Sequence, residues 1–378
     1  MNYSRIALHA LAVFAVAQTC VAHADTTVKI GVAAPLTGEI AHIGKDSEDG
    51  ARLAIEDLNA KKIRIGGQTV IFALDSQDDA ADPKTAVTVA QKLVDDRVAG
   101  VVGHQNSGTS IPASKVYAEA GIPMITESAT NPTLTNQGFK TVFRMVANDS
   151  RQGSVIGTYL VKNLQGKKIA IVDDRTAYGQ GLADEVAKAV VAAGGEVVDR
   201  EYGTDKTVNW MAVLTTVKNH RPDGIAFVSV DTSAAAFLKQ ARALGLTAPV
   251  IVGDAACTLQ LIKLAGSAMN DNVYCTLAGV PTASMPQGPA FFKRFQERFG
   301  TPVQLYAPYA YDAVLAMANA MQAANSVDPK VYLAKLRSDT VEGVTGRIQF
   351  DDKGDIKNGA ITVRQYGQNA WNDKTVVR

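Results

Sequence analysis

The sequence predicts an α/β fold with two lobes, each built around a doubly wound parallel sheet. A length of 378 residues suits two domains of ordinary size. Short apolar runs alternate with segments of helical periodicity, and this alternation starts a second time after residue 148. No stretch rich in Pro, Gly or Ser separates the two series. We therefore expect the hinge to consist of short extended segments.

The first lobe starts with a continuous apolar run at residues 28–34, which is typical of a buried parallel strand. In residues 45–59 apolar side chains recur at spacings of three, four and seven, which predicts a helix. Asp82 followed by Pro83 favours the cap and first turn of another helix. The further predicted elements of this lobe are strands at 70–74, 98–103 and 123–126 and helices at 83–94 and 109–120.

The second lobe repeats the pattern after Asn148. Its predicted helices are a segment ending at Leu164 and segments 179–193, 208–220 and 233–244, and its predicted strands are 168–173, 196–202, 224–230 and 250–252. Helices are also predicted at 287–299, 309–324 and 329–338. The tail at 347–363 is predicted to form strands around a turn at 351–355, where Asp, Lys and Gly cluster.

The first 24 residues have the features of a secretory signal peptide. Arg5 is their only charged residue, an apolar run covers 6–16, and Ala22 to Ala24 provides a small-x-small cleavage pattern. The run is too short to span a bilayer, so we expect cleavage after Ala24 and export to the periplasm. Lipidation at Cys20 is the alternative, although the residues before it are mostly too polar for a lipidation signal.

Cleavage would leave Cys257 and Cys275 as the only cysteines. In an oxidising compartment a disulfide is the default for such a pair. Two separate buried thiols remain the alternative, because sequence does not show their geometry.

Charge and motifs exclude several functions. The 38 basic and 37 acidic residues leave a net charge of +1 without basic clusters, which argues against nucleic acid as a partner. The closest approach to a phosphate loop, residues 38–46, has one residue too many and Asp46 in place of Ser or Thr. There is no nucleophile elbow, dinucleotide fingerprint or zinc spacing, and His104 alone at a strand end is interpreted as structural. We expect no cofactor, no metal and no catalysis.

Small polar residues instead follow two predicted strands. The segment 105–110 joins the strand at 98–103 to a helix, and the segment 126–130 follows the next strand. Open α/β sheets bind ligands at such strand ends, and amide groups at a helix start suit a carboxylate. Ser107 could alternatively serve only as a helix N-cap. Two neighbouring hydroxyl-rich strand ends favour a ligand site.

These residues resemble the periplasmic leucine-isoleucine-valine binding proteins. The segments that carry the resemblance are 101–104, 107–110, 112–114, 125–126, 128–132, 82–87, 178–183, 240–242, 309–311 and 350–355. They fall in family order over the mature chain and are specific only together. The resemblance implies a type I periplasmic binding protein with three hinge crossovers. Such a protein encloses an amino acid by cleft closure and delivers it to an ABC-type membrane permease.

The resemblance also implies roles for individual residues. Ser107 and Thr130 match the positions that hold the ligand carboxylate, and Ser128 matches a position that accepts from the ammonium. Asp254 matches the acidic residue that completes the ammonium site, with a helix cap as its alternative role. Tyr178 matches a residue that closes over the ligand, although a packed ring is also possible there. The remaining candidate ligand-binding residues are Asn106, Asp231 and Tyr306.

The sequence departs from the family around the ligand side chain. Ile43 and Val230 stand where aromatic residues are frequent, and Asp231 follows Val230. Smaller walls would leave room for a longer or aromatic ligand, and Asp231 could favour a cationic group. Ala81 and Asn106 replace a cysteine pair of the family, so the expected bridge has moved to the second lobe.

We therefore expect an exported, monomeric binding protein for a branched-chain or other aliphatic or hydrophobic amino acid. The expected division is a signal peptide at 1–24, lobe I at 25–147 and 280–344, and lobe II at 148–279 and 345–378, with the ligand cleft between the lobes. A ligand sensor or receptor domain on the same scaffold, responsive to an amide or a carboxylate, is the alternative. The signal peptide without a later membrane span argues against that alternative.

Overall fold

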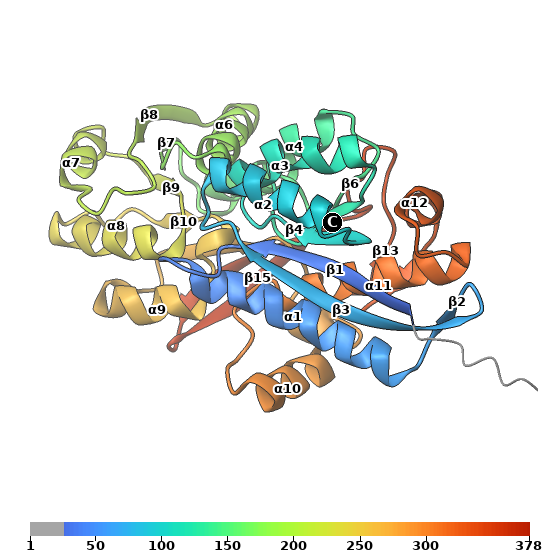
Figure 1. Ribbon diagram of the computed structural model, residues 1–378. Helices are drawn as coiled ribbons and strands as arrows, with labels where there is room; N and C mark the ends of the chain where they lie inside the picture. Colours follow the sequence, from blue (N-terminus) through green and yellow to red (C-terminus); the bar gives the residue numbers. More distant parts are fainter. Residues whose placement is uncertain (1–25) are drawn as a thin grey trace, which may run out of the picture.

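The computed structural model describes residues 26–378. It contains two large β-sheets with helices packed against them, and the sheets form the centres of two lobes (Figure 1). The predicted two-lobed α/β fold is confirmed.

The first sheet has six strands in the order β2-β3-β1-β4-β5-β6. All of its pairs are parallel except β2 with β3. Strand β4 is buried along its whole length, as its apolar run predicts. The strands are β1 (Thr26–Ala34), β2 (Arg64–Ile65), β3 (Gln68–Asp78), β4 (Gly100–Gly103), β5 (Met124–Thr126) and β6 (Val142–Arg144).

The second sheet has seven strands in the order β15-β14-β11-β10-β9-β7-β8. It is parallel except that β14 is antiparallel to both of its neighbours. Its strands are β7 (Lys168–Asp173), β8 (Glu196–Tyr202), β9 (Gly224–Val228), β10 (Val250–Val252), β11 (Val273–Leu277), β14 (Ile361–Gly367) and β15 (Ala370–Val377). Strand β15 was not predicted, because most of its residues are exposed and it lacks an apolar run.

The helices fall into two groups. The first group packs with the first sheet and comprises α1 (Ala41–Ala60), α2 (Pro83–Asp95), α3 (Ser107–Ala120), α4 (Thr133–Asn136), α10 (Gly288–Phe299), α11 (Ala307–Ala324) and α12 (Pro329–Ser338). The second comprises α5 (Asp149–Thr158), which continues as the π-helical turn η1 (Tyr159–Asn163), α6 (Ala177–Ala192), α7 (Met211–Asn219), α8 (Asp231–Ala243) and α9 (Leu259–Ala265). Helix α11 packs along α1 although the two are far apart in sequence (Figure 1).

Two local interpretations fit the structure. The Asp82 carboxylate accepts hydrogen bonds from the backbone N–H groups of Lys84 (3.1 Å) and Thr85 (2.8 Å), and so caps α2 as predicted. The buried His104 ring lies 2.7 Å from an Asp79 oxygen and 3.0 Å from the Tyr117 hydroxyl, which fits a structural role.

Three segments carry the chain between the lobes, at residues 145–148, 278–280 and 356–360. The residues that lead into the first and third crossovers lie together, because the backbone N–H of Arg144 donates to the Gly354 carbonyl (2.9 Å). The Arg144 side chain also binds Asp355 (2.8 Å), so the turn at 351–355 packs with the first sheet. The small ribbon of β12 (Val341–Glu342) and β13 (Arg347–Ile348) precedes this turn.

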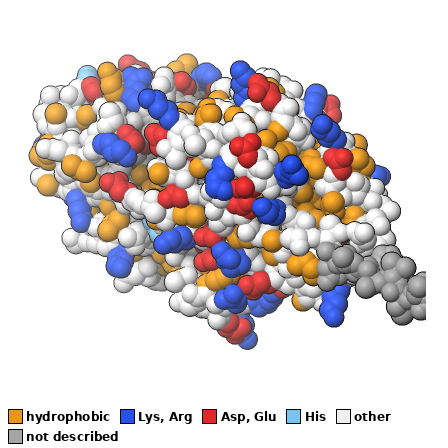
Figure 2. Space-filling model, in the orientation of Figure 1, with side chains coloured by type: hydrophobic (Ala, Val, Ile, Leu, Met, Phe, Trp, Pro, Cys, Tyr) orange, Lys and Arg blue, Asp and Glu red, His pale blue; other side chains and the backbone are white. Residues whose placement is uncertain are grey.

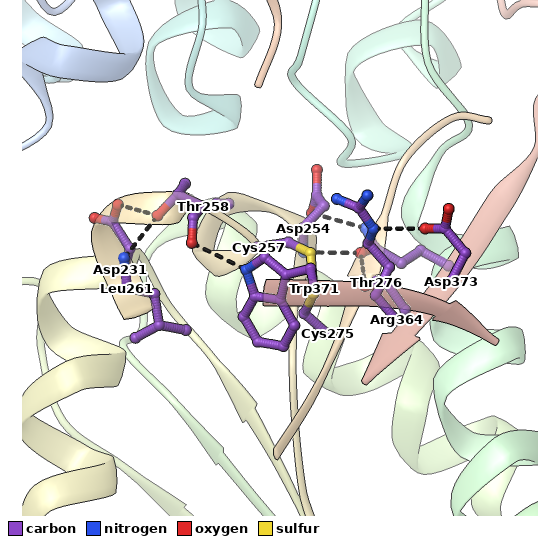
Figure 3. Close-up of a disulfide and its surroundings, with 12 residues drawn as sticks. Asp231, Asp254, Cys257, Thr258, Leu261, Cys275, Thr276, Arg364, Trp371 and Asp373 are labelled. Carbon is purple, nitrogen blue, oxygen red and sulfur yellow. Dashed lines mark hydrogen bonds and ion pairs between the residues drawn. A yellow bond between two sulfur atoms is a disulfide. The ribbon is translucent and has the colours of Figure 1, made fainter. Parts of the chain in front are cut away.

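A disulfide joins Cys257 to Cys275, with their Cα atoms 5.4 Å apart, and this confirms the predicted bridge (Figure 3). Cys275 lies in β11, and Cys257 directly follows the short 3₁₀ helix η2 (Asp254–Ala256). The Trp371 indole lies beside the bridge and donates to the Thr258 carbonyl (3.0 Å). The bridge therefore ties the segment that carries Asp254 to the second sheet.

The predicted signal peptide and Cys20 lie outside the described residues. Within residues 26–378, no helix has both the length and the apolar character needed to cross a membrane. On the face shown in Figure 2, acidic and basic side chains are interspersed and form no large patch of one sign.

Candidate ligand-binding site

A small cavity lies where the two lobes meet. Its lining residues are Ile40, Ile43, Gln105, Asn106, Ser107, Ser128, Ala129, Thr130, Tyr178, Val230, Asp254, Ala255 and Tyr306. Seven of the eight sequence-predicted ligand-binding residues are among them, and only Asp231 is not. The cavity measures about 30 Å³, room for about two water molecules. A ligand of amino-acid size would therefore enter only if the lobes moved apart.

The first-lobe wall consists of the predicted strand ends. Asn106 and Ser107 follow β4 at the start of α3, and Ser128 and Thr130 follow β5. Asn106 occupies the N-cap position without a capping side-chain bond, and Ser107 is the first residue of the helix. Ser107 is thus not the helix cap, and its Oγ accepts from the backbone N–H of Asn131 (3.2 Å).

Part of the hydrogen-bonding capacity of this wall is unused. Among residues 26–378, Thr130 Oγ1 and Asn106 Oδ1 are buried without a hydrogen-bond partner. The Ser107 hydroxyl accepts one bond and donates none to a described residue. Buried polar atoms usually find partners, so a wall with such groups is suited to a polar ligand. Ser128 differs, because its hydroxyl already donates to the Gln105 carbonyl (2.7 Å).

The second-lobe wall centres on the Asp254 carboxylate, which is 1% exposed. Its Oδ1 accepts from the Tyr178 hydroxyl and from Gln152 Nε2, both at 2.9 Å, and its Oδ2 accepts from the Tyr306 hydroxyl at 2.7 Å. Burial raises the pKa of Asp254, and these three donors counteract part of that rise. The side chain caps no helix, since Gly253 is the N-cap of η2 and Thr258 is the N-cap of α9, the helix after Cys257.

Sequence reasoning missed two residues that hold this wall. Gln152 in α5 clamps Asp254 from both sides: its Nε2 donates to the carboxylate, and its Oε1 accepts from the Asp254 backbone N–H (3.1 Å). Asp46 in α1 accepts four backbone N–H groups from residues 304–307 and thereby positions Tyr306. Their partners are far away in the sequence, so no local pattern could have shown either role.

Asp231 lies outside the cavity lining. Its Oδ2 lies 2.8 Å from His42 Nε2 and accepts from the Thr258 hydroxyl at 2.7 Å. Burial alone would lower the pKa of His42, but the hydrogen bond and charge of Asp231 outweigh burial and raise it. The Asp231 charge therefore faces a histidine of the opposite lobe, and the neighbouring Val230 faces the cavity.

Three side-chain contacts join the lobes around the cavity. His42 of α1 pairs with Asp231 of α8, and Tyr306 ahead of α11 binds Asp254. The third contact is a hydrogen bond from Asn131 Nδ2 to the Ala177 carbonyl (2.6 Å). All three require the lobes to be close together.

Two further buried carboxyl groups lie near the first-lobe wall. Burial raises the pKa of Glu127 to about 7. Burial likewise raises the pKa of Asp149 to about 8, and the nearby negative charge of Asp254 adds to the rise. Within residues 26–378, no group of three or more His, Cys, Asp or Glu side chains is arranged to hold a metal ion.

Comparison with known proteins agrees with this architecture. Residues 27–370 match the model of a protein family that is described as periplasmic binding protein. The leucine-, isoleucine-, valine-, threonine- and alanine-binding protein of Pseudomonas aeruginosa is 34% identical over 351 residues, covering 92% of each chain. The Leu/Ile/Val-binding protein homolog 2 of Brucella abortus is 36% identical over 330 residues, covering 87% of each.

Solved structures agree as well. The leucine binding protein LivK of Thermotoga maritima superposes with a TM-score of 0.85 at 26% identity, covering 93% of this chain and 98% of that one. The branched-chain amino acid transporter substrate binding protein LivJ of Streptococcus pneumoniae, in complex with isoleucine, gives 0.84 at 26% identity, covering 93% and 99%. The fold and site define a two-lobed binding protein. The chain belongs to the periplasmic binding protein family, and it is a homologue of the branched-chain amino acid binding proteins.

Proposed function

We propose that this protein captures an amino acid with an aliphatic or hydrophobic side chain and delivers it to an ABC-type permease in the membrane. The observation that carries the proposal is the pairing of the two walls. Hydroxyl groups of Ser107 and Thr130 are available on one side, and the Asp254 carboxylate stands on the other. A zwitterion needs donors for its carboxylate and an anion for its ammonium, so it complements both walls.

The rest of the cavity favours an apolar side chain. Ile40, Ile43, Val230 and Ala255 line it and offer no hydrogen-bonding side-chain group. Asp231 is paired with His42, which leaves it unsuited to a cationic ligand group. The names of the relatives given above include leucine, isoleucine and valine, and one name adds threonine and alanine, which supports an aliphatic ligand class here.

Localisation and organisation complete the proposal. We propose cleavage after Ala24 and a periplasmic, monomeric protein. Lobe I comprises 25–147 and 280–344, and lobe II comprises 148–279 and the chain end. The contacts of Arg144 with Gly354 and Asp355 favour moving the last boundary, so that residues 345–355 belong to lobe I.

A thermal-shift screen of the purified exported protein against all amino acids, followed by calorimetry, tests the proposal. Leucine, isoleucine or valine should raise the unfolding temperature, because a ligand that binds only the folded state stabilises it. Aspartate and lysine serve as charged controls and should have little effect. No shift with any amino acid, or a preference for a charged one, would refute the proposed ligand class.

A further inference from the structure

A second hollow, of about 370 Å³, lies at the hinge. All three crossovers contribute to it, through residues 145–147, 278–280 and 356–360. The remaining lining residues are Ser284, Pro286, Tyr309, Thr345, Gly346, Arg347, Gln349 and Arg378. None of its lining residues is shared with the cavity between the lobes. Its volume falls within the range of small-molecule sites.

The charge at this hollow is unbalanced. Arg347 and Lys357 line it, and no Asp or Glu side chain does. Both residues are exposed at the rim of the hollow, and neither side chain has an ion pair or hydrogen bond with the described residues. The nearby Asp312 is buried behind Thr345, whose backbone N–H (2.8 Å) and hydroxyl (2.6 Å) both donate to its carboxylate.

The hollow also has apolar walls. Met145, Val146, Val280, Ile356 and Ala360 line it on the crossovers themselves. A ligand that complements this surface would combine one negative charge with a short apolar part. Such a combination is that of a small aliphatic carboxylate.

The residues that line the hollow pack closely against the hinge crossovers. The Tyr309 hydroxyl of α11 lies so close to Gly279 of the second crossover that a Cβ atom there would come within 1.7 Å of it. A rotation of the lobes must change the crossovers, and with them the shape of the hollow. A ligand that fits the hollow better in one conformation must shift the balance between open and closed forms.

We propose that the hinge hollow is a second ligand site, which binds a small aliphatic carboxylate between Arg347 and Lys357 and thereby modulates closure of the cleft. The site is separate from the amino-acid site and does not depend on its assignment. By linkage, an amino acid in the cleft must change the affinity of the hinge for the carboxylate by the same factor.

Butyrate is a suitable probe, since it lacks the ammonium group that Asp254 would bind. We would titrate it by NMR into the purified exported protein at constant ionic strength, with and without saturating leucine. The double variant R347E/K357E should weaken binding at least about tenfold, and R347K/K357R should retain it. The control K115E/K293E makes the same change in net charge at exposed sites away from the hollow and should bind as the wild type does.

Coupling is measured as the leucine affinity at increasing butyrate. We expect a change of about fivefold that levels off as the hinge site fills, and no change in R347E/K357E. Absence of saturable butyrate binding, or equal binding by R347E/K357E, would overturn the site. A leucine affinity that keeps falling with butyrate would show competition in the cleft instead, and an affinity that stays constant at saturation would refute the modulation.

Discussion

The two walls of the cavity between the lobes differ in how far their polar groups are already hydrogen-bonded. On the first-lobe wall, Thr130 Oγ1 has no partner among the described residues, and the Ser107 hydroxyl has donated no hydrogen bond to them. On the second-lobe wall, Asp254 already accepts three hydrogen bonds, from Gln152, Tyr178 and Tyr306. The first-lobe wall therefore has hydroxyl groups that can still bind a ligand, and the second-lobe wall holds the Asp254 carboxylate in a fixed orientation.

This difference follows from the cost of burial. A hydroxyl without a partner costs little compared with a buried carboxylate, which must be paired or protonated. Asp254 can remain ionised between the lobes only with such donors, and the donors also fix its orientation. An incoming ammonium then meets an oriented anion and requires little rearrangement.

The largest expected effect comes from Asp254→Asn. This variant keeps the size of the side chain but removes the only charge of the second-lobe wall. We expect the affinity for leucine to fall by about 2 to 5 kcal/mol, which is thirtyfold or more, measured by calorimetry. Asp312→Asn is the matched control, because Asp312 is equally buried but binds Val344 and Thr345 away from the cavity. It should lower thermal stability and leave affinity unchanged; a similar loss of affinity in both variants would contradict the role of Asp254.

Ser107→Ala tests the first-lobe wall. Loss of one charge-assisted hydrogen bond to the ligand carboxylate should cost about 1.5 to 3 kcal/mol, roughly ten- to a hundredfold in affinity. Ser110→Ala is the control, since the buried Ser110 hydroxyl donates to the His104 carbonyl and does not line the cavity. Unchanged calorimetric affinity in S107A would remove this residue from the site.

Gln152→Leu tests whether Asp254 is held in place by its neighbour. The variant removes a donor from the Asp254 carboxylate, so we expect about a tenfold loss of affinity. It should also raise the pKa of Asp254 further, because one bond that opposes the effect of burial is lost. The affinity should then decline at a higher pH than in the wild type as the solution is acidified. A purely structural role would lower stability without moving this pH profile.

The contact of His42 with Asp231 should make closure depend weakly on pH. The pKa of His42 is raised above its ordinary value of 6.5 in this conformation. The contact is therefore fully present below pH 6.5 and is lost as pH rises through the raised value. Leucine affinity should fall by about two- to fivefold over that rise, as expected for a partly exposed pair. His42→Gln should flatten the profile and His220→Gln should not; identical profiles in all three proteins would exclude the contact from closure.

The sequence predicted the first-lobe wall better than the second. Ser107, Ser128 and Thr130 follow apolar strand runs, and parallel topology brings such strand ends together. Asp254 and Tyr178 were found only through the resemblance, because no local pattern distinguishes them from a helix cap or a packed ring. Asp231 was expected near the ligand, but its histidine partner lies 189 residues away.

The same reason accounts for the errors in the fold. Most buried parallel strands have apolar runs and were found, but the buried strands β6 (Val142–Arg144) and β11 (Val273–Leu277) were missed. The exposed β15 (Ala370–Val377) was missed because it has no apolar run. Gln152 and Asp46 were missed because their roles depend on residues more than 100 positions away. Long-range pairing is a property of the folded chain and is absent from any short window of sequence.

Small-angle scattering with and without saturating leucine tests most directly whether the ligand bridges the two walls. A ligand held by Ser107 and Thr130 on one lobe and by Asp254 on the other binds the closed form better, and moving a mostly open population to a mostly closed one requires ~5.5 kcal/mol of preference. We predict a smaller radius of gyration with leucine, and a blunted change in Asp254→Asn. Identical scattering profiles of the wild type, under conditions where calorimetry shows binding, would contradict the bridge between the walls.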